Sequence, residues 1–464
     1  MQTDCQTRES ARPWILRVTQ DRYSTLQWWE LMLVKSVATF AKRGAQLIVP
    51  LGIVAGLYGA LIRRELDLFG LGLILWGVSE IGFAVYWQVE LSKPFQRKAS
   101  PMSLKDKINT SHRLMEHVDD MQDMLGDWML QRPDKVPASH IYSWIIYLLF
   151  DKDESDLTPD ESEEADVLFS MFGDNFMPKH DSTCDSESPS VAMRPSLDPM
   201  WCFPKPFLFY LVIQASHWVG AMVLRLEGFR YHKVQGQGYW RLEGTTKQDP
   251  ILYIHGVGVG FPMYTAKLKA MCKRYKGREV ILLELPHISM APCGGILNHD
   301  QTLKALDAIF CRHQICKVSL VAHSFGTIIA SWLIRQRPNS VSRLTMFDPV
   351  CFRIWDSTLA RNFLYAEPFS FIHELMRFFV AMDPLITQTV SKELYWYESV
   401  LFPEDIHVPT NIFLSRDDWV VDAIECQEYL QDKLPKGSHL KLMDTSHAGC
   451  LRSSKFYNDI IDKI

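Results

Sequence analysis

The stretch VAHSFGT, residues 321–327, decides the fold. The apolar run VSLV before Ala322 predicts a buried strand, and the run IIASWLI after Thr327 predicts a helix. A serine on a sharp turn from strand to helix presents its hydroxyl as a nucleophile. Such a turn is crowded, so small residues are needed two positions on either side of Ser324. Gly326, two positions after the serine, is the usual residue at its position. Ala322, two positions before the serine, stands where glycine is more common. A simple N-cap role for Ser324 is the alternative.

Three further motifs follow predicted strands. They are HGVGVG at residues 255–260, SRDDWVV at 415–421 and DTSHAG at 444–449. From residue 228 onward, short apolar runs alternate with helical segments, which predicts a mainly parallel, doubly wound sheet. The predicted strands cover residues 229–234, 239–242, 250–254, 279–285, 317–321, 343–347, 410–414 and 440–443.

Because each of these motifs follows a predicted strand, residues 228–464 resemble the α/β-hydrolase fold of lipases and esterases. The resemblance is strongest to the membrane-anchored α/β-hydrolases of fungi and other microbial eukaryotes. Nucleophile, acid and histidine stand in the order of that fold. Ser324 needs a base, and His447 in a glycine-containing loop is the candidate. Asp418 would orient the imidazole and stabilise its charged form.

The resemblance also predicts an oxyanion site. Its donors would be the backbone N–H groups of Val257 and Phe325. The loop that carries Val257 also contains His255, Gly256 and Gly258, and its glycines let the backbone approach a substrate closely.

Two other acids stay open as partners of the histidine. Asp417 adjoins Asp418, although the D-W-V-V spacing favours Asp418. Asp348, in FDPV after the sixth predicted strand, occupies the position at which some lipases carry their acid; a turn before Pro349 would also explain it. His255 and His323 lie beside the motifs, and each is interpreted as a residue that supports the catalytic groups or packs against them.

The first hundred residues predict a membrane anchor. Residues 44–62 contain no charge and residues 69–87 contain one, Glu80, so each run is long enough to cross a bilayer as a helix. The short linker predicts an antiparallel hairpin, and the flanking basic residues favour both ends in the cytosol. Glu80 is interpreted as a hydrogen-bonded structural residue rather than a functional one.

A helical region over residues 101–227 joins the anchor to the catalytic domain. The pattern predicts an amphipathic helix over 102–131, another over 139–150, and disorder over 181–190. A third apolar run, 207–224, contains Gln214, Ser216 and His217, so it is interpreted as an interfacial or domain-packing helix rather than a plain span.

Composition excludes several classes of function. The 464 residues carry a formal net charge of -5, which gives no reason to expect nucleic acid as a partner. Ten cysteines without CxxC pairs predict reduced thiols rather than a disulfide framework or a zinc site. The acidic stretch from Asp151 lacks the glycine and glutamate of a calcium loop at its sixth and twelfth positions. We therefore expect no metal and no cofactor.

The sequence thus predicts an α/β-hydrolase fold, with a helical cap over residues 352–408, preceded by a membrane-anchoring helical region. The cap aromatics Phe378, Phe379, Trp396 and Tyr397 suggest an apolar acyl pocket, with ordinary helix packing as the alternative. The expected function is a serine hydrolase cleaving esters of a lipid or other apolar substrate, on an intracellular membrane and facing the cytosol. An acyltransferase using the same triad and a silent membrane scaffold are the alternatives.

Overall fold

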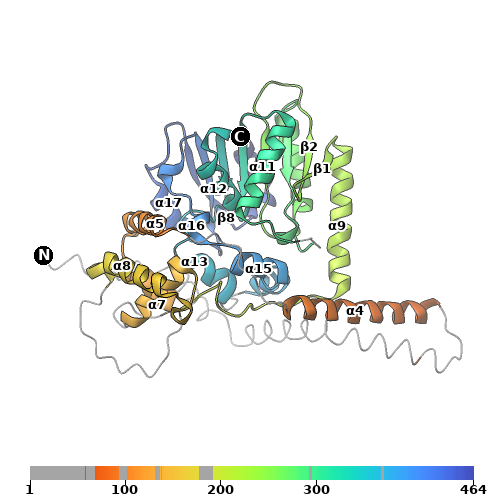
Figure 1. Cartoon of the computed structure of the whole chain (residues 1–464). Helices are drawn as coiled ribbons and strands as arrows, with labels where there is room; N and C mark the ends of the chain where they lie inside the picture. Colours follow the sequence, from red (N-terminus) through yellow and green to blue (C-terminus); the bar gives the residue numbers. More distant parts are fainter. Residues whose placement is uncertain are drawn as a thin grey trace.

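A computed structural model describes residues 58, 68–92, 102–130, 136, 138–176, 192–291, 295–366 and 370–464 (Figure 1). The predicted helix over 44–62, apart from Tyr58, and the predicted disorder over 181–190 lie outside these residues. The second predicted membrane helix, 69–87, falls within a single described helix, α4 (Leu68–Ser92).

The described residues form an eight-stranded sheet with the order β1-β2-β4-β3-β5-β6-β7-β8. Strand β2 runs antiparallel to its neighbours β1 and β4, and all other neighbouring pairs are parallel. This arrangement confirms the mainly parallel sheet. The strands are β1 (Arg230–Val234), β2 (Gln237–Leu242), β3 (Ile251–Ile254), β4 (Val280–Leu283), β5 (Val318–His323), β6 (Val341–Phe347), β7 (Thr410–Asp417) and β8 (His439–Ser446).

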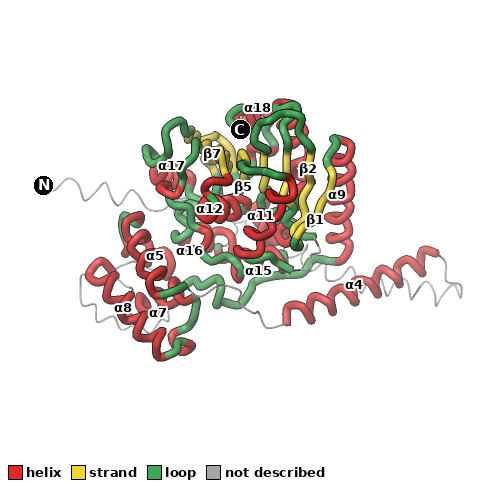
Figure 2. The backbone as a smooth tube through the Cα atoms, turned by 45° about the horizontal axis from the view of Figure 1, so that its top comes forward, coloured by secondary structure: helices red, strands yellow, loops and turns green. Residues whose placement is uncertain are grey.

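Helices cover both faces of the sheet, because alternate strand residues point to opposite sides. In β3, Leu252 belongs to the core beneath α11 and α12, whereas Tyr253 belongs to the core beneath α10 and α18. Figure 2 shows the strands between these helices. The helices of this domain are α10 (Thr265–Arg274), α11 (His299–His313), α12 (Gly326–Gln336), α17 (Ala423–Leu430) and α18 (Ser454–Ile461).

The segment between β6 and β7 is helical and forms the cap. Its elements are α13 (Ser357–Ala360), η7 (Arg361–Tyr365), α14 (Phe371–Met376), η8 (Arg377–Ala381), α15 (Pro384–Lys392) and α16 (Trp396–Ser399). Short helical turns elsewhere are η3 (Glu154–Asp156), η4 (Phe261–Tyr264), η5 (Pro286–Ile288), η6 (Pro338–Ser340), η9 (Pro403–Asp405) and η10 (Gly449–Leu451).

Four described helices belong to the linker region between α4 and the sheet. They are α5 (Leu104–His117), α6 (Met121–Met129), α7 (Ala138–Phe150) and α8 (Pro159–Phe176). The predicted continuous helix over 102–131 is wrong: α5 ends at His117, and Asp120 caps α6 by accepting the N–H groups of Gln122 and Asp123. Trp144 and Leu168 share one hydrophobic core with Val390 of the cap. The linker helices are therefore part of the wall around the catalytic domain.

Two described helices are long and apolar enough to cross a membrane, within α4 and α9 (Phe207–Leu226). Helix α9 lies along the edge of the catalytic domain beside β1, and α4 runs across its start (Figure 1). On α9, His217 packs edge-to-face on Phe261 at 5.1 Å between ring centroids. The opposite face exposes Trp218, Val219 and Met222. Helix α9 is thus a domain-packing helix with an uncovered apolar face.

Glu80 links these two helices. Its carboxylate accepts the backbone N–H of Phe207 at 2.6 Å and that of Leu208 at 3.2 Å, and also the indole N–H of Trp76 at 2.9 Å. The first N–H groups of a helix have no partner within the helix and carry the positive end of its dipole. Glu80, the single charge in the run 69–87, is therefore the N-terminal partner of α9.

Candidate active site

Ser324 lies in the turn between β5 and α12. All six residues of β5 are buried, and α12 begins two positions after the serine, at Gly326. The serine backbone has φ +50°, the left-handed region that non-glycine residues rarely adopt. Its N–H donates to the carbonyl of Phe347 at the end of β6, at 3.1 Å. Its hydroxyl does not cap α12, so the N-cap alternative does not describe this residue.

Close backbone approaches make the turn possible. A Cβ on Gly326 would lie 2.5 Å from the carbonyl oxygen of Ile254, at the end of β3. A Cβ on Gly256 would lie 2.8 Å from the Cβ of Ser324. Both distances are too short for an alanine, whereas Ala322 lies within β5 and is tolerated there. The glycines therefore let the loop after β3 lie directly against the serine turn.

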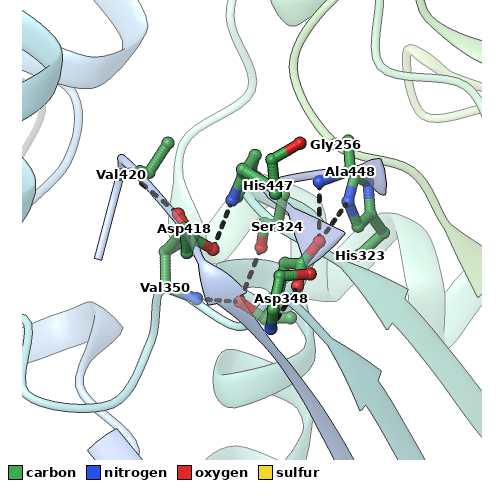
Figure 3. A network of polar contacts seen from close by, with 12 residues as sticks. Gly256, His323, Ser324, Asp348, Val350, Asp418, Val420, His447 and Ala448 are labelled. Carbon is green, nitrogen blue, oxygen red and sulfur yellow. Dashed lines mark hydrogen bonds and ion pairs between the residues drawn. The ribbon is translucent and has the colours of Figure 1, made fainter. Parts of the chain in front are cut away.

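His447 and Asp418 form a hydrogen-bonded series with the serine (Figure 3). Ser324 Oγ lies 2.9 Å from His447 Nε2, and His447 Nδ1 lies 2.7 Å from Asp418 Oδ2. The other carboxylate oxygen of Asp418 accepts the N–H of Val420 at 2.7 Å and of Val421 at 3.3 Å. These two N–H groups fix the carboxylate, so the neutral imidazole carries its proton on Nδ1 and offers Nε2 to the hydroxyl.

The electrostatics of the site favour a charged imidazole. Burial disfavours that form, but the charge and hydrogen bond of Asp418, together with the charge of Asp348, outweigh it and raise the pKa of His447 to about 9. Burial raises the pKa of Asp418 above its ordinary value, although the neighbouring His447 opposes that change. A histidine held in this way would stabilise a proton received from a hydroxyl at Nε2.

The three candidate acids differ in burial and in their hydrogen-bond partners. Asp417 is exposed at the end of β7, whereas Asp418 directly after it is buried and contacts His447. Asp348 is fully buried but hydrogen-bonds to backbone. Its Oδ2 accepts the N–H of Ala448 at 2.7 Å, and its Oδ1 accepts the N–H of Ser415 at 3.1 Å. Asp348 thus ties the loop that carries His447 to the strand that leads to Asp418.

A second buried polar series runs beside the first, and the sequence analysis did not identify it. The N–H of Gly256 donates to the hydroxyl oxygen of Tyr264 at 3.0 Å, and that hydroxyl lies 2.6 Å from His323 Nδ1. His323 Nε2 lies 3.8 Å from Asp348 Oδ2. Burial lowers the pKa of His323 and keeps the ring neutral. Tyr264 belongs to no sequence motif, so no local signal marks it.

The predicted loop of the oxyanion site lies against the serine. His255 is buried and neutral, because burial lowers its pKa to about 4. Its Nε2 accepts the N–H of Leu285 at 3.2 Å, which fixes the start of the loop. Within the described part of the chain, the backbone N–H groups of Val257 and Phe325 have no hydrogen-bond partner. Gly258 has φ +143°, a conformation that favours glycine.

A cavity of about 570 Å³ opens at Ser324, and most of its walls are apolar. The residues around it are Val257, Ser324, Phe325, Val350, Leu359, Phe363, Met376, Val380, Val390, Leu394, Trp419, Val420 and His447. The four cap aromatics suggested by sequence are not among them. Phe378 and Phe379 instead pack against Phe203 and Phe209. Phe363 of the cap and Trp419, directly after the acid in SRDDWVV, are aromatic wall residues that the sequence analysis missed.

One group of side chains within the described residues has the composition of a metal site. Donor atoms of Asp348, Asp418 and His447 lie within 4.8 Å of one another. Hydrogen bonds to Ser324, to each other and to backbone N–H groups account for these atoms. Each of these side chains therefore already has hydrogen-bond partners among the described residues.

No family model matches the chain. A curated relative, sn-1-specific diacylglycerol lipase ABHD11 from Danio rerio, is 24% identical over 106 residues, which are 23% of this chain and 33% of the relative. The match therefore spans about a third of that relative's length.

Solved structures of low sequence identity also match. A bacterial membrane phospholipase A is 16% identical with a TM-score of 0.38, and covers 55% of this chain and 94% of its own. Carboxylesterase CesB from Bacillus subtilis is 12% identical with a TM-score of 0.40, over 54% and 95%. The strand order and the turn between β5 and α12 show that residues 228–464 have the α/β-hydrolase fold.

Proposed function

We propose that the protein is a serine hydrolase that cleaves a carboxylic ester of a lipid or other apolar acyl substrate. The observation that carries the proposal is the series Ser324–His447–Asp418, with contacts of 2.9 and 2.7 Å, at the opening of an apolar cavity. A hydroxyl, a base and an orienting acid in this geometry are what nucleophilic acyl transfer requires.

The reaction follows from these positions. Neutral His447 takes the proton of Ser324 as Oγ attacks the ester carbonyl carbon, and the carbonyl oxygen becomes an oxyanion. The free N–H groups of Val257 and Phe325 would stabilise that charge. His447 then gives the proton to the leaving alcohol, and the acyl group stays on Ser324. Water, activated by His447, attacks the acyl-serine and releases the carboxylic acid.

Labelling with a fluorophosphonate tests the chemistry, because the bound phosphonate mimics the tetrahedral intermediate. We expect stoichiometric labelling that maps to Ser324 and disappears in Ser324→Ala. Ser331→Ala is a matched control, since that hydroxyl lies in α12 and bonds to the carbonyls of Ile328 and Ser399. A folded wild-type protein that takes up no label and cleaves no ester across an acyl panel would replace the proposal with a silent scaffold.

We also propose that the chain is anchored in an intracellular membrane, with the catalytic domain on the cytosolic side. Support comes from α4, which exposes Leu75, Val78 and Ile81 and is long enough to span a bilayer. The uncovered apolar face of α9 adds lipid-facing surface beside it.

Carbonate extraction of membranes tests the anchor. The full chain should stay in the pellet, and deletion of residues 44–87 should weaken its retention. Recovery of the full chain wholly in the soluble fraction would contradict the anchor while leaving the hydrolase proposal standing.

A further inference from the structure

A second cavity lies behind the first. It measures about 670 Å³ and is bounded by residues from segments that are far apart in the chain. Trp128 of α6 and Leu148 of α7 contribute one side, and Ser391 and Trp396 of the cap contribute the other. The linker helices α6 and α7 therefore form part of the wall of this cavity.

Three aliphatic side chains belong to the walls of both cavities. Leu359, Val390 and Leu394 line both the cavity at Ser324 and the cavity at the linker helices. We call these three residues the partition. They come from α13, from α15 and from the segment after α15, so all of them belong to the cap. Side chains of this kind offer no hydrogen bond, and they can limit a ligand only by their volume.

The walls behind the partition suit a hydrocarbon chain. The indole N–H of Trp128 donates to the carbonyl of Trp355 at 2.9 Å, and that of Trp396 donates to the carbonyl of Leu148 at 2.8 Å. These polar atoms are therefore satisfied by the backbone. Asp151 and Ser196, which also line this cavity, hydrogen-bond to each other.

We propose that the partition is the end of the acyl pocket and sets the longest acyl chain that the enzyme accepts. The inference rests on the proposed ester hydrolysis at Ser324. An acyl group held at Ser324 extends through the first cavity until its terminal methyl meets Leu359, Val390 and Leu394. Shortening one of these side chains joins the two cavities, and longer chains then continue toward the linker helices.

The test uses the purified full-length protein in detergent and p-nitrophenyl esters from acetate to palmitate. The readout is the ratio of kcat/KM for a long ester to that for a short one. Leu394→Ala should raise this ratio by roughly fourfold for each additional methylene that enters the second cavity. Leu394→Phe should lower the ratio, because a larger side chain shortens the pocket.

A refilled double variant provides the matched control. Ala360 lines the second cavity and not the first, so Ala360→Phe alone should leave the wild-type profile unchanged. Combined with Leu394→Ala, it should return the ratio to the wild-type value. Fluorophosphonate labelling of every variant reports an intact Ser324 site independently of chain length.

The outcomes distinguish failure of this inference from failure of the proposed ester hydrolysis. If Leu394→Ala labels normally but changes all esters by the same factor, the partition does not set chain length. If Ala360→Phe alone removes the activity on long esters, wild-type substrates already pass the partition, and the inference is wrong. If the wild type neither labels nor cleaves any ester, the proposed function fails before the partition is tested.

Discussion

Replacing Asp418 by asparagine tests the role of the buried acid most directly. In the wild type, one carboxylate oxygen holds the N–H of Val420 at 2.7 Å, and the other lies 2.7 Å from His447 Nδ1. The asparagine carbonyl would keep the backbone contact, which places its NH₂ group opposite Nδ1. A donor at that position favours the tautomer with the proton on Nε2. The imidazole could then no longer accept the proton of Ser324.

The expected loss follows from that change of tautomer. The corresponding substitution in other triads lowers kcat on the order of 10⁴-fold. That factor corresponds to about 5.4 kcal/mol of transition-state free energy, at ~1.36 kcal/mol for each tenfold. The substitution is nearly isosteric at a fully buried position, so the fold should be preserved.

The assay is steady-state hydrolysis of a p-nitrophenyl ester, with thermal unfolding to confirm the fold. Asp417→Asn is the matched control, because the neighbouring side chain is exposed and should change kcat by about twofold or less. Equal losses in both variants, or more than about a tenth of wild-type activity in Asp418→Asn, would refute the assignment of Asp418 as the acid.

Three further predictions concern other contacts. His447 must be neutral to act as a base, so kcat/KM measured against pH should rise as the pH approaches the pKa of His447, about 9. Asp348→Asn removes a carboxylate charge that raises this pKa. The acidic limb of the pH profile of this variant should therefore lie at lower pH. Glu80→Ala leaves the first N–H groups of α9 without their partner and should lower the free energy of unfolding by about 1–3 kcal/mol, measured by thermal unfolding in detergent, with an unchanged melting temperature as the contrary result. Gly326→Ala places a Cβ 2.5 Å from the carbonyl oxygen of Ile254 and should abolish fluorophosphonate labelling; full labelling would show that the turn can relax.

The general fold could be predicted because its signals are local. The buried strand, the serine turn and the following helix are neighbours in the chain, and each obeys a short-range pattern of apolar and small residues. The boundary between α5 and α6 was missed because the apolar spacing continues across it, whereas the capping side chain of Asp120 ends one helix and starts the next.

The sequence by itself determined the order of strands and helices, the position of Ser324 and the motifs that contain a histidine and an acid. Contacts between distant segments decided the rest. Glu80 meets the start of α9 across 127 positions of chain, and Asp348 reaches Ala448 across 100. The cavity at Ser324 likewise draws its walls from the glycine loop, the cap and the loop after β7. Such contacts depend on how elements pack against one another in space, and a linear pattern of residue types contains no record of that packing.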